Sequence, residues 1–154
     1  MKRSIQAIYL LSSIIGIITF SPQTLASFQG NLNIEVGGLK NQKGQVCFSL
    51  FASNKGFPDN GQSAVQARCV KLTARPERIS IPNLKAGNYA VAIIHDINND
   101  GILNKNVLGI PTEGFGFSNN PPIRTGPPKF GDSAVLVAGS STNIQIQLQY
   151  FLGR

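Results

Sequence analysis

The sequence predicts an all-β protein, a single antiparallel Greek-key β-sandwich of about seven strands. From Gln29 onward, short segments of apolar residues are separated by Gly, Pro and Asn, and no helical periodicity lasts beyond a turn or two. Gly87 and Tyr89 also form a Gly-x-Tyr sequence that opens a β-rich run directly after a turn. A Tyr placed there can bury its ring at a sheet corner and return its hydroxyl to the backbone, near residues 84–86.

The first half of the chain contains four expected strands. Residues 32–36 and 45–51 alternate between two faces: one face of the first carries Leu32, Ile34 and Val36, and the second carries Val46, Phe48 and Leu50 opposite Cys47, Ser49 and Phe51. Residues 65–72 and 78–81 predict two further strands. Residues 52–64 contain Gly, Pro, Asn and Asp, which predicts a loop or a very short helix between the second and third strands.

The second half predicts three more strands and one long loop. Residues 84–96, 133–139 and 142–150 are the expected strands, and the last alternates apolar residues with uncharged polar ones, which indicates a half-exposed strand. Residues 99–131 are rich in Asn, Gly and Pro and predict one long loop. A loop of this length without structure of its own is usually functional or stabilised by additional interactions.

The N-terminal segment has the features of a cleavable signal peptide over residues 1–26. A short basic start is followed by an apolar run over residues 5–20 and by small residues that end at Ala26. The alternative is a membrane anchor, which is less favoured because the apolar run is short and interrupted. We therefore expect a periplasmic or secreted β-sandwich domain over residues 27–154.

The charge distribution does not point to nucleic acid. Removal of Lys2 and Arg3 with the signal peptide lowers the formal net charge from +7 to +5, and the remaining basic residues are dispersed without a nucleic-acid-binding motif. A solvated basic surface is the simpler interpretation. Weak contact with anionic envelope polymers or lipid headgroups is the functional alternative.

Cys47 and Cys69 are the only cysteines of the chain. An exported protein with an even number of cysteines meets oxidising conditions that favour a bridge, so we predict a Cys47–Cys69 disulfide. The alternative is a pair of buried free thiols.

The segment HDINNDGILNKN, residues 95–106, resembles the first half of a calcium-binding loop. Calcium requires several oxygen ligands and a Gly where the backbone bends sharply between them. Counted from Asp96 as position 1, positions 3, 5, 6, 7 and 9 of this loop are Asn98, Asp100, Gly101, the Ile102 carbonyl and Asn104. Position 12 is Val107 rather than the expected Glu, so the segment is not an EF-hand in the strict sense.

A carboxylate from farther along the chain could complete the ligand set. Glu113 is the best candidate, because it lies in the same predicted loop and has Gly109 and Gly114 near it. The alternative needs no metal: Asn99, Asp100 and Gly101 are turn formers, and their side chains can satisfy local backbone donors. Chemistry alone leaves calcium and a plain turn open.

His95 is the only histidine, and it shares a strand face with Tyr89, Val91 and Ile93. A lone His in that setting is more often structural than a catalytic base. A hydrolytic site with Ser118 as nucleophile is disfavoured, because GFGFS lacks the strand-turn-helix setting of a nucleophile elbow.

Phe115 and Phe117 stand between glycines in EGFGFSNNPPIRTGPPKF, residues 113–130. We expect them to pack the long loop onto the sandwich. The alternative is an exposed surface lined by aromatic residues and Pro that recognises a partner.

Two segments, LKAGNYAVAIIHDINNDGILNKNVLGIPTEGFGFSNN and GPPKFGDSAVLV, resemble the bacterial family known as domain of unknown function 2141. The resemblance covers residues 29–150. It implies an exported β-sandwich that is similar to immunoglobulin-like, transthyretin-like and collagen-adhesin B-type modules, some of which carry comparable calcium loops. Asn104 stands where many members have Asp, which lowers the negative charge available to a cation.

The expected function is an exported, non-enzymatic binding or accessory module of the cell envelope with a calcium-stabilised loop and an unidentified envelope or extracellular ligand. The alternative is a small envelope enzyme that uses His95 with Asp96 or Glu113 as acid and base.

Overall fold

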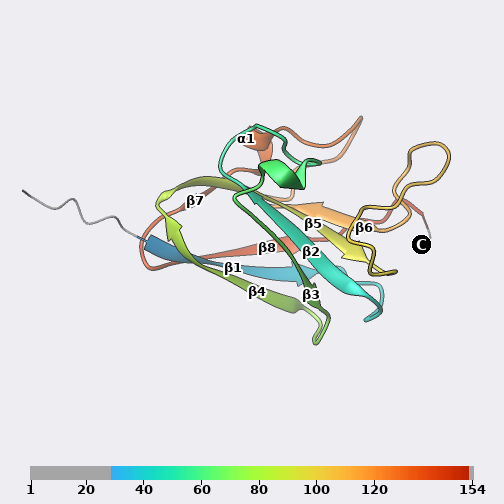
Figure 1. Cartoon of the computed structure of the whole chain (residues 1–154), viewed down its shortest axis with the longest axis horizontal. Coiled ribbons are helices and arrows are strands. Elements are labelled where there is room, and N and C mark those ends of the chain that lie inside the picture. The colour runs from blue at the N-terminus through green and yellow to red at the C-terminus, as the bar shows by residue number, and fades with distance from the viewer. Residues whose placement is uncertain (1–28, 153–154) are drawn as a thin grey trace, which may run out of the picture.

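Two β-sheets pack face to face in the computed structural model, which describes residues 29–152 (Figure 1). The first sheet has the strand order β4-β1-β8, and the second has the order β3-β2-β5-β6, with β7 also paired to β5. The strands are β1 (Gln29–Gly37), β2 (Gln45–Phe51), β3 (Gln66–Lys71), β4 (Glu77–Lys85), β5 (Gly87–Asp96), β6 (Gly114–Phe117), β7 (Val135–Val137) and β8 (Ser141–Gln147). The predicted signal peptide lies outside the described residues.

The predicted β-sandwich is therefore confirmed, with one difference in strand direction. β1 pairs antiparallel with β4 but parallel with β8, so that Ile34 lies between Ile79 and Ile144. Alternation of side chains has a period of two residues in both kinds of pairing, so the sequence pattern could not distinguish them.

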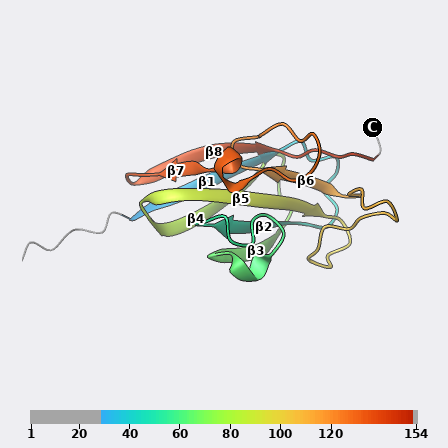
Figure 2. The same ribbon diagram turned by 90° about the horizontal axis from the view of Figure 1, so that it is seen from above.

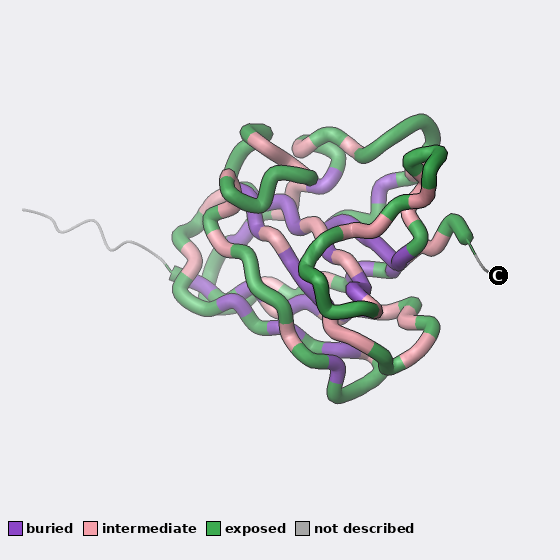
Figure 3. Tube along the Cα trace, turned by 45° about the vertical axis from the view of Figure 1, so that its right-hand side comes forward, coloured by how far each residue is buried: buried purple, intermediate pink, exposed green. Residues whose placement is uncertain are grey.

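The core lies between the two sheets and is built from the alternating apolar positions of their strands. Figure 3 shows that buried positions follow the strands, whereas the connecting loops are exposed. Full burial of each large apolar side chain contributes roughly 1.5–3 kcal/mol before the entropy of ordering it is counted. The least exposed core side chains include Leu32, Ile34, Val36, Ile81 and Ile146 from the first sheet, and Val46, Phe48, Leu50, Val91, Ile93 and Val137 from the second.

The prediction of one uninterrupted loop over residues 99–131 was wrong, because β6 divides it. Phe115 and Gly116 of β6 pair with Ile94 and Ile93 of β5. The strand was missed because its sequence, GFGF, is half glycine and reads as a turn. The glycines are required by packing: a Cβ on Gly116 would lie 2.9 Å from the Ile146 side chain, and one on Gly114 would collide with the Tyr150 ring.

Short helical elements close the second sheet. Residues 52–64 contain the 3₁₀ helix η1 (Gly61–Ser63), and β7 is preceded by the one-turn helix α1 (Phe130–Ser133). In Figure 1 both lie at the upper edge of the molecule. Within residues 29–152, no helix has the length and apolar character needed to cross a membrane.

The Cys47–Cys69 disulfide is confirmed, and it links β2 to the edge strand β3. The two residues are direct cross-strand partners in the antiparallel ladder. Cys47 is buried and Cys69 is exposed. The bridge therefore fixes the register of an edge strand that has only one neighbour.

Tyr89 lies at the start of β5, with its ring buried in the core. Its hydroxyl donates a hydrogen bond of 3.0 Å to the carbonyl of Lys85, the last residue of β4. This contact lies within the segment that the Gly-x-Tyr sequence indicates. It ties β4 in one sheet to β5 in the other across a turn of a single residue.

We predict that Tyr89→Phe lowers the free energy of unfolding by about 1 kcal/mol, because the ring stays in the core while the Lys85 carbonyl loses its donor. Urea denaturation followed by circular dichroism would measure the loss. An unchanged midpoint would show that water replaces the hydroxyl without cost.

Candidate functional site

The candidate site is the segment between β5 and β6, residues 97–113, which we term the 97–113 loop. It leaves the sheet at Asp96 and returns to it at Gly114. It projects from one end of the sandwich, near the C-terminus, as the yellow and orange segment of Figures 1 and 2.

Asp96 anchors the start of the loop. Its side chain is fully buried, and its Oδ1 accepts a hydrogen bond from the Asp100 amide at 3.1 Å. Its Oδ2 accepts hydrogen bonds of 2.8 Å from the Gly101 amide and from the side chain of Gln45 on β2. Hydrogen bonds to a charged acceptor are stronger than neutral ones, so this carboxylate compensates for its burial by holding the turn.

The chain bends sharply at Asn99 and Gly101, which have positive φ angles of 64° and 80°. Gly adopts this conformation without the steric cost of a Cβ, and Asn tolerates it better than most residues. The bend returns the backbone amides of residues 100 and 101 to the Asp96 carboxylate.

Glu113 closes the loop from its other end. The side chain is buried, its Oε1 accepts from the Ile97 amide at 2.8 Å, and its Oε2 accepts from the Asn104 amide at 3.0 Å. One carboxylate therefore joins the beginning, middle and end of the segment. The sequence analysis proposed Glu113 as a metal ligand of this loop. In the structure, Glu113 contacts the loop and holds its backbone.

Asp100 organises the exposed side of the loop. Its Oδ1 accepts from the Ile102 amide at 3.0 Å, and its Oδ2 accepts from the side-chain amides of Asn98 and Asn104 at 2.8 and 2.9 Å. The pKa of Asp100 lies below its ordinary value, because the Ile102 amide and the side-chain amides of Asn104 and Asn98 donate to its charged form.

The oxygen chemistry of this cluster fits calcium. Asn98 and Asn104 both donate to Oδ2 of Asp100, and rotation of either Asn amide by half a turn would present its oxygen beside this carboxylate in place of its nitrogen. The Ile102 carbonyl belongs to the same segment. Carboxylate, amide and carbonyl oxygens are the ligands that calcium takes in proteins.

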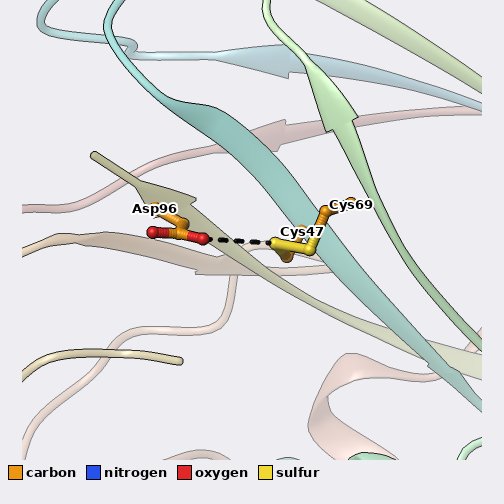
Figure 4. A group of neighbouring side chains, drawn as sticks. All are labelled: Cys47, Cys69 and Asp96. Atoms are coloured by element: carbon orange, nitrogen blue, oxygen red, sulfur yellow. Dashed lines mark hydrogen bonds between the residues drawn. A yellow bond between two sulfur atoms is a disulfide. The ribbon is translucent and has the colours of Figure 1, made fainter. Parts of the chain in front are cut away.

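The three carboxylates expected around a metal do not form one compact group. Among the His, Cys, Asp and Glu side chains of residues 29–152, the only group of three whose ligand atoms lie within 4.8 Å of one another is Cys47, Cys69 and Asp96 (Figure 4). Cys47 Sγ lies 3.7 Å from Asp96 Oδ2, but both cysteines are joined in the disulfide and offer no thiolate. The arrangement of Asp96 and Glu113 is that of backbone anchors on either side of Asp100.

The tip of the loop exposes apolar side chains. The Asn106 carbonyl accepts a hydrogen bond of 2.9 Å from the Gly109 amide, and the Asn106 side chain accepts from the amides of Leu108 and Ile110. This turn presents Val107 at 102% and Leu108 at 77% relative exposure. A backbone fixed in this way with apolar side chains in solvent is typical of a contact surface.

His95 lies on the face of β5 opposite to Asp96, inside the sandwich, and is fully buried. Its Nε2 lies 2.8 Å from the Lys43 carbonyl, and its Nδ1 lies 2.6 Å from the Tyr150 hydroxyl. Because a carbonyl only accepts, Nε2 carries a proton and donates a hydrogen bond to the Lys43 carbonyl. Burial raises the pKa of the Tyr150 hydroxyl.

The contacts of His95 and Ser118 are structural ones. His95 and Asp96 are consecutive on a strand, so their side chains point to opposite faces and form no acid–base pair. Glu113 contacts the loop backbone rather than His95. Ser118, also fully buried, accepts from the Val91 amide and donates to the Ser133 carbonyl, which fixes α1 to β5.

Several contacts of the site were not predicted from the sequence. Asp96 accepts a hydrogen bond from Gln45, and His95 has hydrogen-bond contacts with Lys43 and Tyr150. The two residues of each pair are more than fifty positions apart in the sequence. The pairing of β2 with β5 brings Gln45 and Lys43 to these positions, and nothing in the local sequence indicates the contacts. For Tyr150, the sequence predicts only a position on the apolar face of the last strand, and it does not indicate the contact with His95.

An aromatic cluster covers the outer face of the second sheet. Phe115 and Phe117 project from β6 away from the central core, and their ring centroids are 6.0 Å apart. Edge-to-face contacts extend this cluster to Phe57 and Phe51 on one side and to Phe151 on the other. Phe115 and Phe117 thus pack the flanking loops onto the sandwich, as the interpretation of these residues as anchors predicts.

Comparison with known proteins gives one result. Residues 34–145 match the model of the family described as "Uncharacterized protein conserved in bacteria (DUF2141)". The chain belongs to this family. The match extends from β1 into β8, so the 97–113 loop lies within the part that defines DUF2141. No curated protein and no solved structure matches the chain.

For this DUF2141 protein, we predict that Asp96→Asn lowers the free energy of unfolding by roughly 1–3 kcal/mol in EDTA. The amide group keeps one acceptor but sets an N–H against a backbone donor. Urea denaturation would measure the change. The matched control is Asp59→Asn on the exposed surface, which should change stability by less than about 0.5 kcal/mol. Equal effects of the two substitutions would contradict the anchoring role of Asp96.

Proposed function

We propose that the protein is exported and acts as a non-enzymatic binding or accessory module of the cell envelope, with calcium stabilising the 97–113 loop. One observation carries this proposal. Two buried carboxylates, Asp96 and Glu113, anchor the loop to the sandwich, while Val107 and Leu108 at its tip are exposed. Binding residues are commonly carried by loops that a rigid scaffold positions.

Export is supported by the leader sequence and by the disulfide. Residues 1–26 have a basic start, an apolar run and a small-residue end. The Cys47–Cys69 bridge suits an oxidising compartment, because cytosolic thiols are kept reduced.

A non-enzymatic role is supported by the environment of the residues that could do chemistry. His95 is fully buried and hydrogen-bonded through both ring nitrogens. Ser118 is fully buried and hydrogen-bonded to two backbone groups. Both side chains stabilise the fold, and neither is presented to a substrate at the surface.

Calcium binding is supported by the oxygen atoms around Asp100. Asn98 and Asn104 both donate to the Asp100 carboxylate, so three oxygen-bearing side chains are already gathered at one place, where a cation would take direct coordination from their oxygen atoms. The buried anchors Asp96 and Glu113 add negative charge behind this cluster. The exposed position of Asp100 leaves the cluster open to solvent on one side.

We predict that calcium raises the melting temperature of the mature protein, residues 27–154, by roughly 5–10 °C over its value in EDTA. Magnesium should give a smaller shift, because it requires tighter octahedral geometry and gives up its water reluctantly. Differential scanning calorimetry and titration calorimetry of chelated protein would measure the shift and the heat of binding.

Two variants test whether the effect comes from the loop. Asp100→Asn should remove most of the calcium-dependent increase. Glu35→Gln is the matched control, because it removes one carboxylate from the exposed pair with Arg78 on the other sheet, and it should keep the increase. An identical melting temperature in calcium and in EDTA, with no heat of binding, would show that the loop is held by its own turns alone.

A further inference from the structure

A cavity of about 380 Å³ lies beside the 97–113 loop, on the outer side of the second sheet. One wall is the returning part of the loop, residues 103–111, and the opposite wall is the segment 123–127. Its volume lies within the range of small-molecule sites, roughly 300–1,000 Å³.

Aromatic and aliphatic side chains form most of the cavity lining. Phe115 and Phe117 are buried, at 5% and 8% relative exposure, and Phe151 is half exposed, at 51%. The ring of Phe151 packs against Phe115 with a centroid distance of 5.1 Å. Ile110 and Ile123 extend the apolar lining from the two loops. A ligand here would bury an apolar body against these rings.

The charged residues of the lining favour an anion. Lys105 and Arg124 supply two positive charges, and Asp59 supplies the one negative charge. The side chains of Lys105 and Arg124 form no ion pair or hydrogen bond with a residue of the described chain. Both are exposed, so they are free to turn toward a ligand at the cavity entrance. The excess positive charge selects against a cationic head group.

We infer that this cavity binds a small amphipathic carboxylate, with its alkyl or aryl body against Phe115, Phe117 and Phe151 and its carboxylate at Lys105 and Arg124. Arg and Lys both donate charge-assisted hydrogen bonds to a carboxylate, and Arg can do so through two parallel bonds. The inference rests on the proposed function and deepens it, because the 97–113 loop forms one wall of the cavity and the inference names the class of ligand that the binding module takes.

The test is a titration of ¹⁵N-labelled mature protein with octanoate, followed by the backbone amide shifts. We expect saturable shifts confined to residues 103–110, 115–117 and 123–126. Octylamine has the same chain with a positive head group, and acetate has the carboxylate without the chain. Neither should shift these amides in a saturable way. Absence of octanoate shifts, or equal binding of octylamine, would overturn the inference.

A double variant, Lys105→Gln with Arg124→Gln, should weaken octanoate binding on the order of tenfold. Its matched control is Lys71→Gln with Lys85→Gln, which removes the same charge from exposed strand positions outside the cavity and should bind as the parent protein does. Equal weakening in both variants would assign the effect to net charge and contradict a site at Lys105 and Arg124. If the Lys105 and Arg124 variant does not fold, the comparison of octanoate with octylamine binding to the parent protein still tests whether the cavity prefers a carboxylate.

The titration is run once in EDTA and once in calcium, so that the two proposals are separated. Calcium binding is read from the amides of residues 97–102, and octanoate binding from those of the cavity. Octanoate binding without any response to calcium would refute only the calcium part of the proposed function. A response to calcium without octanoate binding would refute only the amphipathic ligand.

Discussion

The Asp96 carboxylate is the interaction on which the functional end of this protein depends. It is buried at the last residue of β5, where a charge without partners would be costly, and three N–H donors compensate for that burial. Two of these donors belong to the backbone of the turn that follows, so the turn and the charge stabilise each other. Glu113 repeats the arrangement at the other end of the loop. The direction of the whole 97–113 loop follows from these two carboxylates.

The two faces of β5 have separate roles. Toward the centre, Tyr89, Val91, Ile93 and His95 contribute to the packing between the sheets, and His95 contacts Tyr150, which follows β8. Toward the outside, Asp96 anchors the loop, and Ile94 lies beside Phe115 of β6. Because consecutive side chains of a strand point in opposite directions, changes to the outer face can alter the loop and the adjacent cavity without disturbing the core.

Calcium and the amphipathic carboxylate would act on the same loop from different sides. The oxygen cluster around Asp100 lies close to β5, whereas the cavity is lined by the part of the loop that returns toward β6. Ordering of the first part reduces the freedom of the second, so a cation could increase ligand affinity without contacting the ligand. The aromatic cluster of Phe115, Phe117 and Phe151 supplies the fixed surface against which this loop packs.

The sequence by itself determined the class of fold, the disulfide pair and the segment of the candidate site. Alternation at Leu32, Ile34 and Val36 and the Gly-x-Tyr sequence depend on local geometry, which a sequence pattern records directly. Only the tertiary structure decided that β1 and β8 run parallel, that GFGF forms a strand, and that Gln45 and Tyr150 complete the environments of Asp96 and His95. These features arise from contacts between distant segments, and the period of a strand is the same whichever neighbour it pairs with.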